Sequence, residues 1–172
     1  TSMPTSSGSY PPLLFIEFFA GEGNLSEHVS RRGLPTLRDD LLSGGIDFSV
    51  ATEVDSWREK LRQLSEGHRL ILHFAPPCST FSRARDRSRR TRVRSAAQPG
   101  GIHPPSPLVL TANAIARHSW ELAEWAHRTL GAGVSIENPS NSYLWSYLEN
   151  MFESAKPGET VTDVVFSMCR FG

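Results

Sequence analysis

Cys78 stands where a cysteine could act as a nucleophile, in the segment HFAPPCSTFS at residues 73–82. The apolar run at 69–75 predicts a strand, which Pro76 and Pro77 end because proline cannot continue a central strand. We therefore expect Cys78 to be presented at the strand tip, although a lone cysteine is more often buried and inert. The arginines that follow would favour the thiolate, the form that attacks. Four residues separate Cys78 from Arg83, without glycines, which does not fit a cysteine-phosphatase loop.

A glycine turn, FAGEGN at residues 19–24, follows the apolar run at 13–19, which predicts a buried strand. Glycines let a ligand approach the backbone closely, and the helix that follows offers free N–H groups. Ser26 stands where the dinucleotide fingerprint has its third glycine, so a structural turn is about as well supported as a cofactor loop. Asp39, after a weaker strand at 35–38, could accept ribose hydroxyls or be a solvated acid in a turn.

Glu137 ends a short predicted strand at 134–137 and precedes Asn138 and Pro139. A carboxylate at the end of an apolar strand is costly to bury without a partner. Glu137 is therefore either a site residue or an ordinary acid that caps a helix or forms a salt bridge.

An arginine run follows Cys78 and carries a net charge of +6, whereas the rest of the chain carries −6. Its members are Arg83, Arg85, Arg87, Arg89, Arg90, Arg92 and Arg94, with Asp86 as the one acid among them. Guanidinium groups suit phosphate. The surrounding segment, 82–107, lacks apolar periodicity and predicts a long mobile loop, either functional or an unstructured basic segment such as a localisation signal.

The elements that position these residues alternate between strands and helices. Helices are expected at 25–32, 54–65, 108–130 and 143–151, a further strand at 160–171, and either a strand or a loop at 44–50. The long helix should bury one face, formed by Leu108, Ala112, Ile115, Leu122, Ala126 and Leu130. The pattern predicts an α/β sandwich with a mainly parallel sheet. Ligands bind beyond the carboxyl ends of such strands, where all three candidate motifs fall.

Composition restricts the class of protein. The 172 residues suffice for one domain with a hydrophobic core, preceded by a flexible leader at 1–12 that does not resemble a signal peptide. No apolar run is long enough to span a bilayer, so no membrane partner is expected. Cys78 and Cys169 fit neither a disulfide framework nor a zinc site, which favours reduced thiols, an intracellular location and no metal.

Three of these motifs together resemble the DNA cytosine-5 methyltransferase family. FIEFFAGEGNLS is similar to the family's first motif, APPCSTFS to its nucleophile loop and IENP to its ENV motif, in the same order and with similar spacing. VVFSMCRFG is similar to the strand before the next arginine-bearing motif. The resemblance covers 13–172. It implies a Rossmann-like three-layer sandwich of the class I methyltransferase type, without the family's C-terminal target-recognition part, and a nuclear location in a eukaryote.

The resemblance also implies roles for individual residues. S-adenosylmethionine would be the cofactor, with Asp39 at its ribose and Asp47 and Phe48 at its adenine. Cys78 would attack carbon 6 of a flipped cytosine, and Glu137 would hold ring nitrogen 3 and the exocyclic amine. The remaining cofactor-binding residues would be Glu17, Phe19, Ala20, Gly21, Gly23, Asn24, Leu25 and Pro76. The substrate loop would comprise Pro77, Ser79, Ser82, Arg83, Arg85 and Asn138.

Two other functions remain open from the sequence. A catalytically silent relative could bind nucleic acid or a protein partner, and an amino-methyltransferase would act on an exocyclic nitrogen. The latter normally has an aromatic residue where Cys78 stands. DNA is favoured over RNA as the partner, although relatives with this cysteine loop act on both.

Overall fold

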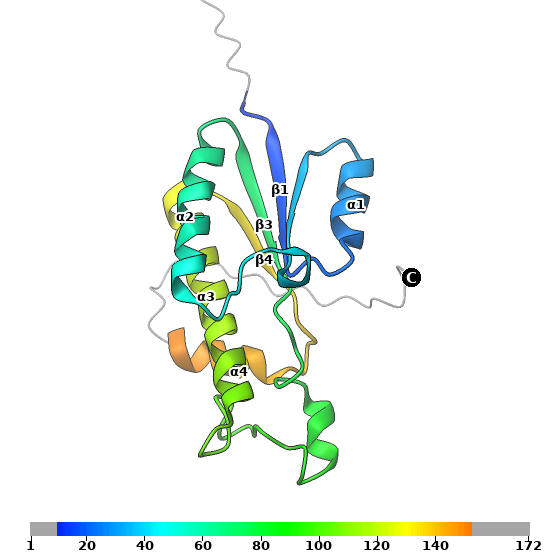
Figure 1. Cartoon of the computed structure of the whole chain (residues 1–172), viewed down its shortest axis with the longest axis vertical. Coiled ribbons are helices and arrows are strands. Elements are labelled where there is room, and N and C mark those ends of the chain that lie inside the picture. The colour runs from blue at the N-terminus through cyan, green and yellow to red at the C-terminus, as the bar shows by residue number, and fades with distance from the viewer. Residues whose placement is uncertain (1–9, 153–172) are drawn as a thin grey trace, which may run out of the picture. The chain divides into compact units, whose positions relative to one another are not determined.

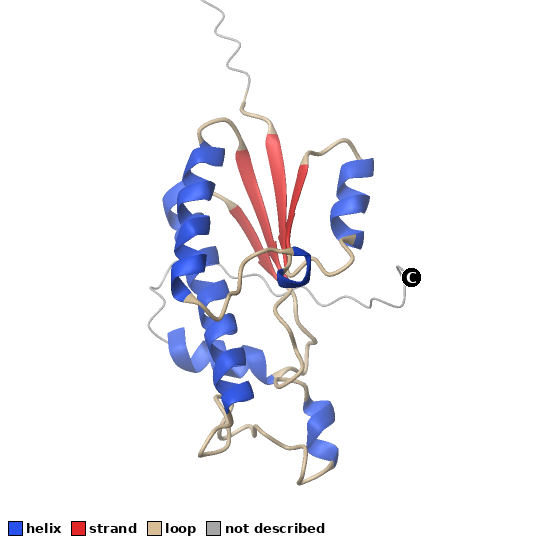
Figure 2. Cartoon of the chain, viewed as in Figure 1, coloured by secondary structure: helices blue, strands red, loops and turns tan. Residues whose placement is uncertain are grey.

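The computed structural model describes residues 10–152, in which four strands form one parallel sheet of order β2-β1-β3-β4 (Figure 1). The strands are β1 (Leu13–Phe18), β2 (Thr36–Asp39), β3 (Arg69–Phe74) and β4 (Gly133–Ile136). The helices are α1 (Asn24–Arg31), α2 (Ala51–Ser65), α3 (Pro107–Leu130) and α4 (Tyr143–Phe152), with short 3₁₀ helices η1 (Leu41–Ser43) and η2 (Arg83–Arg87). The strands gather into one sheet with helices beside it (Figure 2). The α/β class with a parallel sheet, of Rossmann-like type, is therefore confirmed.

The described chain forms two compact units. The first contains the residues up to Pro77 together with Ala114–Glu137, and so includes the whole sheet. The second contains Cys78–Asn113 and the residues from Asn138 onward, and so includes η2 and α4. The single domain expected from chain length is thus built from two parts.

The core of the first unit lies on one face of the sheet. Alternate residues of the central strands point to this face because side chains in a strand alternate, and they meet apolar residues of α2 and α3. These core residues are Leu14, Ile16, Phe18, Leu70, Leu72 and Phe74 of the sheet, Val54, Trp57 and Leu61 of α2, and Leu122, Ala123 and Ala126 of α3. The opposite face carries Glu17 and His73, which are in register on β1 and β3. There α1 meets the sheet through Ser26.

Several sequence-based boundaries differ from the structure. Residues 45–50 contain no strand, so the loop alternative for 44–50 is correct. α2 begins at Ala51 rather than at Val54, because its first turn has no large apolar residue and hydrophobic periodicity cannot detect it. The predicted face of α3 is wrong at its start: Leu108 is exposed, whereas Val109 is buried. The strand predicted at 160–171 and Cys169 lie outside the described residues.

Candidate functional site

The glycine turn after β1 adopts the left-handed backbone conformation at three positions. Phe19 has φ 61°, Gly21 has φ 53° and Gly23 has φ 74°. A phenylalanine is rarely found there, and such strain persists where the surroundings enforce it, often in a ligand site. Here the Phe19 N–H donates to the carbonyl oxygen of Asp39 at 2.9 Å, and the ring packs on Phe48. The strained turn is therefore held by the end of β2.

Asp40 also holds this turn. Its Oδ2 accepts a hydrogen bond from the Gly21 N–H at 2.9 Å, and its Oδ1 accepts one from the Leu42 N–H at 2.9 Å. Asp40 therefore joins the glycine turn to η1. The sequence alone assigned this residue no role, because an acid at this distance from a glycine turn has no distinctive spacing.

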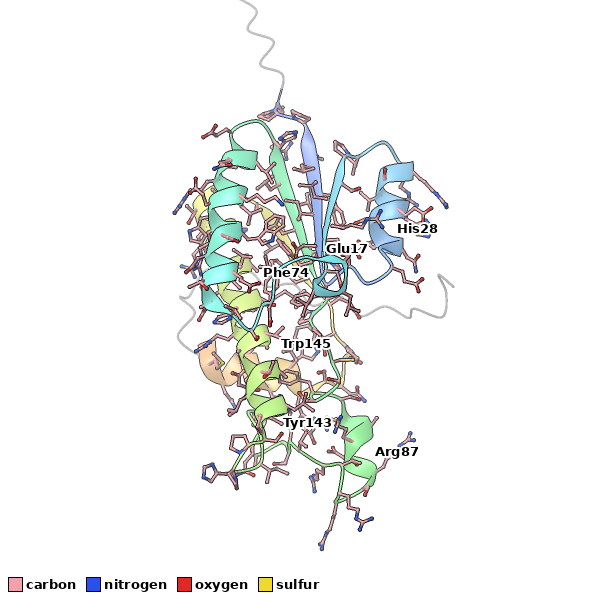
Figure 3. All side chains as sticks on the ribbon, in the orientation of Figure 1. Glu17, His28, Phe74, Arg87, Tyr143 and Trp145 are labelled. Atoms are coloured by element: carbon pink, nitrogen blue, oxygen red, sulfur yellow. The ribbon has the colours of Figure 1, made fainter. Side chains whose placement is uncertain are left out.

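Glu17 is buried and fixes the start of α1. Its Oε2 accepts hydrogen bonds from the Ser26 N–H at 2.9 Å and from the Ser26 hydroxyl at 2.5 Å. These bonds satisfy Oε2 of a carboxylate that would otherwise be more costly to bury. Figure 3 shows Glu17 near the carboxyl end of β1. Its observed role is to attach α1, and with it the glycine turn, to the sheet.

Asp39 is almost fully buried, and both of its carboxylate oxygens accept hydrogen bonds from protein groups. Oδ2 accepts from the Trp57 indole N–H at 3.0 Å, and Oδ1 from the Ile46 N–H at 3.2 Å. The expected role at a ribose must therefore use the second lone pairs of these oxygens. The observed role is to connect β2 with α2 and with the loop that follows η1.

A tryptophan-to-phenylalanine exchange tests this role of Asp39. Trp57→Phe removes the indole donor and leaves a buried carboxylate oxygen without its partner, so the free energy of unfolding should fall by about 1–3 kcal/mol. Urea denaturation measures the change. Trp125→Phe is the matched control, because the Trp125 indole packs at the edge of the core and under Arg62 without holding a carboxylate. Equal losses in the two variants would contradict the role assigned to Asp39.

Phe48, whose expected role at the adenine stays a prediction, packs its ring into the core. The ring is 2% exposed and packs edge-on against Phe18 and Phe74, so neither face is open to a ligand. Its carbonyl oxygen faces Nδ1 of His118 at 2.7 Å. The sequence could not separate a core aromatic from a ligand-binding one in this short loop. The neighbouring Asp47 is half-buried, and its Oδ1 accepts a hydrogen bond from the Ser49 N–H at 2.7 Å.

The residues around the glycine turn fit a nucleotide-like cofactor in three respects. A Cβ placed on Gly21 would meet nothing within 4 Å, so the turn faces open space. Among the described residues, the N–H groups of Asn24 and Leu25 have no acceptor, so they can bind an anionic group at the start of α1. Ala20 is half-buried and Leu25 is 39% exposed beside this turn.

Glu137 continues β4 by one residue, and its N–H donates to the carbonyl oxygen of Phe74 at 2.8 Å. It is half-buried, and its charge acts on His73. Burial lowers the pKa of His73, while the charges of Glu17 and Glu137 partly oppose that shift. Nδ1 of His73 lies 2.9 Å from the hydroxyl of Ser135. His73 is therefore an imidazole of lowered pKa that interacts electrostatically with two carboxylates.

Cys78 is exposed, as the two prolines predict. Pro76 is buried and Pro77 is exposed at the end of the first unit, and Cys78 begins the second unit. The turn from Cys78 to Ser82 is closed by the Ser82 N–H, which donates to the Cys78 carbonyl oxygen at 2.8 Å. The Ser82 hydroxyl accepts from the Ala84 N–H and so begins η2.

Two residues anchor this turn while two others remain accessible. Thr80 and Phe81 are each 1% exposed, whereas Cys78 and Ser79 face solvent. The Phe81 carbonyl oxygen accepts a hydrogen bond from the Tyr143 N–H at 2.9 Å. The thiol is therefore displayed from a turn with a buried base, a geometry that suits a nucleophile.

The arginine run is not a uniform basic surface. Arg94 is 1% exposed, and its guanidinium group is bonded internally. Nε of Arg85 donates to the Ser79 carbonyl oxygen at 2.8 Å, and Arg83 lies over the Tyr143 ring at 4.8 Å. Arg92 is 3.7 Å from a carboxylate oxygen of Asp86.

Three arginines of the run remain exposed and have no side-chain partner among the described residues. They are Arg87, Arg89 and Arg90. Figure 3 shows Arg87 projecting outward from η2. These three guanidinium groups are available to an external anion.

The segment 82–107, predicted to be a long mobile loop for lack of apolar periodicity, is attached by polar side chains. The Tyr143 hydroxyl donates to Oδ2 of Asp86 at 2.6 Å and so attaches η2 to α4, and this bond raises the pKa of Tyr143. Arg94 attaches the later part of the segment. Periodicity could not reveal this, because the anchors are polar side chains and not apolar ones.

The predicted site residues are thus divided between the two units. The cofactor candidates and Glu137 belong to the first, whereas Cys78, Ser79, Ser82, Arg83, Arg85 and the half-buried Asn138 belong to the second. The chain passes between the units at Pro77–Cys78, at Asn113–Ala114 and at Glu137–Asn138. Both proposed catalytic residues therefore lie next to a point where the chain changes unit.

Within residues 10–152, no group of three histidine, cysteine or acidic side chains could hold a metal ion. No helix in this part of the chain is long and apolar enough to cross a membrane. Comparisons with protein-family models, curated proteins and solved structures found no match to this chain.

Proposed function

We propose that this protein is an S-adenosylmethionine-dependent methyltransferase that transfers a methyl group to carbon 5 of cytosine in nucleic acid, with DNA favoured over RNA. The observation that carries the proposal is the exposed Cys78, displayed from a turn whose next residues, Thr80 and Phe81, are buried. The resemblance of the three motifs to the cytosine-5 methyltransferases supports the assignment of this thiol as the nucleophile.

The cofactor proposal rests on the open glycine turn. Gly21 and the available N–H groups of Asn24 and Leu25 would hold the cofactor, and Asp39 and Asp40 keep the turn in shape. S-adenosylmethionine, when bound, supplies an electrophilic methyl group. The chain's own residues must then make carbon 5 of the cytosine nucleophilic.

Cys78 performs this activation in the proposed mechanism. The thiolate sulfur adds to carbon 6 of the cytosine, and the electron pair of the 5,6 double bond becomes available at carbon 5. Glu137, as the carboxylic acid, would donate its proton to ring nitrogen 3 as the sulfur adds, which neutralises the negative charge that develops on the ring, and its other oxygen would accept a hydrogen bond from the exocyclic amine. After carbon 5 has gained the methyl group it loses its proton, the sulfur leaves carbon 6, and the double bond is restored.

Nucleic-acid binding is assigned to the exposed arginines Arg87, Arg89 and Arg90. Phosphate contacts supply most of the affinity for nucleic acid and make it depend on salt, and Arg is well suited to them. Access to a base within a duplex requires that the base be flipped out. The run around these arginines follows the proposed nucleophile in the same unit.

The identity of the methylated atom tests the proposed function. Protein, labelled S-adenosylmethionine and cytosine-containing DNA or RNA are incubated, the nucleic acid is digested, and the nucleosides are separated. We expect label in 5-methylcytosine. Label on the exocyclic amine would instead identify an amino-methyltransferase. Cofactor or nucleic-acid binding with no methylated product would favour a catalytically silent relative.

The salt dependence of binding tests the arginine assignment. Replacing Arg87, Arg89 and Arg90 by glutamine should reduce the slope of log K against log salt by about 3 for duplex DNA, because each neutralised phosphate contributes about 0.9. The control replaces Arg31, Arg32 and Arg62 by glutamine, which changes the net charge equally in the first unit. Fluorescence anisotropy at several salt concentrations measures both slopes. Equal slopes in the two variants would contradict the assignment.

A further inference from the structure

Arg94 is a buried cation with no acidic partner among the described residues. It is 1% exposed, and burial lowers its pKa to about 10. A buried charge is costly unless every polar hydrogen is paired. A residue of this kind is expected to hold a specific arrangement of its neighbours, because each of them must be in place to compensate the charge.

All five N–H groups of the guanidinium are used. Nε donates to the Thr80 carbonyl oxygen at 3.1 Å, and Nη2 donates to the Thr80 hydroxyl at 2.8 Å and to the Val109 carbonyl oxygen at 3.5 Å. Nη1 donates to the Pro99 carbonyl oxygen at 2.6 Å and to Oδ1 of Asn113 at 2.8 Å. No donor remains for a phosphate, so Arg94 differs in kind from the exposed arginines of the same run.

These partners join three parts of the second unit. Thr80 lies inside the turn that displays Cys78, Pro99 lies in the segment after the arginine run, and Val109 and Asn113 lie on α3. Asn113 itself donates to the Gly100 carbonyl oxygen at 2.7 Å, which fixes the orientation of its amide. Arg94 is therefore the centre of a network that attaches the Cys78 turn to α3.

The planar guanidinium group of Arg94 also stacks on an aromatic ring. Its central carbon lies 3.6 Å from the centre of the Phe81 ring, and Phe81 also packs against Tyr147. Stacking on an aromatic ring and forked hydrogen bonding both require a planar cation, which lysine does not provide. The base of the Cys78 turn is thus clamped on two consecutive residues, Thr80 and Phe81.

From this geometry we infer that Arg94 is a positioning residue for the Cys78 turn: it holds the thiol in place without touching substrate. The assignment to catalysis rests on the proposed function, whereas the assignment to the turn does not. Arg94→Lys keeps the charge but loses the planar fork. It should therefore disturb the thiol while leaving the exposed arginines and their phosphate contacts unchanged.

The first experiment measures methyl transfer by Arg94→Lys. We expect kcat to fall by about a hundredfold, because a displacement of about 1 Å can cost that much, while KM for nucleic acid and the salt slope of binding stay as in wild type. Arg62→Lys, an exposed arginine of α2, is the control and should retain wild-type kcat. A normal kcat in Arg94→Lys, or a change confined to KM and the salt slope, would overturn the inference.

The second experiment does not depend on methyltransferase activity. In a Cys169→Ser background, the alkylation rate of Cys78 by iodoacetamide is measured for wild type, Arg94→Lys and Arg62→Lys, each in buffer and in denaturant. In buffer, the alkylation rate of Cys78 in Arg94→Lys should shift towards the rate measured in denaturant. The rate in Arg62→Lys should equal that of wild type. Circular dichroism verifies that each variant is folded under the assay conditions. Equal rates in buffer for all three would overturn the inference even if the protein methylates nothing.

A milder variant keeps the inference falsifiable if Arg94→Lys does not fold. Thr80→Val removes one hydroxyl acceptor of Nη2 and preserves the shape of the side chain. The same shift in alkylation rate, of smaller size, is expected. A rate equal to that of wild type would count against the inference.

Discussion

Replacing Cys78 by alanine is expected to abolish methyl transfer and to leave cofactor binding nearly unchanged. The thiolate is the only group assigned to make carbon 5 nucleophilic, so no step can proceed without it. The proposed cofactor residues lie in the first unit, whereas Cys78 is an exposed residue of the second, and its removal should not affect the glycine turn. Methyl transfer is measured with labelled cofactor, and cofactor binding by isothermal titration.

Glu137→Gln should likewise reduce methyl transfer strongly while leaving cofactor binding nearly unchanged. The amide preserves the size of the side chain but has no acidic proton to give to ring nitrogen 3, and removing a stabiliser of this kind typically costs about 10²–10³ in kcat. Glu124→Gln is a control for removing a half-buried carboxylate from the same unit. Methylation by Cys78→Ala, with the product on the exocyclic amine, would show that the protein is an amino-methyltransferase.

The second large effect is expected at Gly23. A Cβ at this position would overlap Nη1 of Arg38 and lie 2.6 Å from its Cδ, and the φ of 74° disfavours any other residue. Gly23→Val should therefore displace the glycine turn and abolish binding of S-adenosylmethionine at about 1 mM. The obstruction belongs to the protein itself, since the space beside Gly23 is filled by Arg38.

Matched variants separate backbone strain from steric overlap. In Gly21→Ala the positive φ strains the backbone, but the new Cβ meets nothing within 4 Å. In Gly23→Ala the backbone is strained and the new Cβ also overlaps Arg38. We expect Gly23→Ala to weaken cofactor binding more than Gly21→Ala does. Adding Arg38→Ala to Gly23→Ala should restore part of the lost affinity, because it vacates the space beside residue 23. Isothermal titration measures all three. Wild-type affinity in Gly23→Val would contradict the proposed cofactor site.

The fold could be predicted from the sequence because its signals are local. Apolar runs marked β1 and β3, glycines ended α1 and α3, and the prolines at 76 and 77 correctly indicated that Cys78 is exposed. The start of α2 could not be located, since its first turn has no large apolar residue. A similar difficulty arises at Leu108 and Val109, where helical periodicity alone was ambiguous by one residue.

Long-range contacts between polar residues could not be predicted. Asp39 and Asp40 are adjacent acids in the sequence, yet one is bonded to Trp57 and the other to Gly21. Arg94 and Arg90 belong to the same run, yet one is buried in a network and the other is exposed. Composition and spacing treat such pairs alike, because the distinction arises only when distant parts of the chain pack together.

A covalent adduct between Cys78 and 5-fluorocytosine is the most direct test of the proposed nucleophile. Fluorine at carbon 5 cannot leave as a proton does, so the sulfur stays attached to carbon 6 after methyl transfer. Protein, S-adenosylmethionine and nucleic acid containing 5-fluorocytosine should give a complex that survives denaturing electrophoresis, and peptide mass spectrometry should locate the bond at Cys78. Cys78→Ser should give no complex. An adduct on another residue, or 5-methylcytosine produced from ordinary substrate without any adduct from the fluorinated one, would contradict the assignment of Cys78 as the nucleophile.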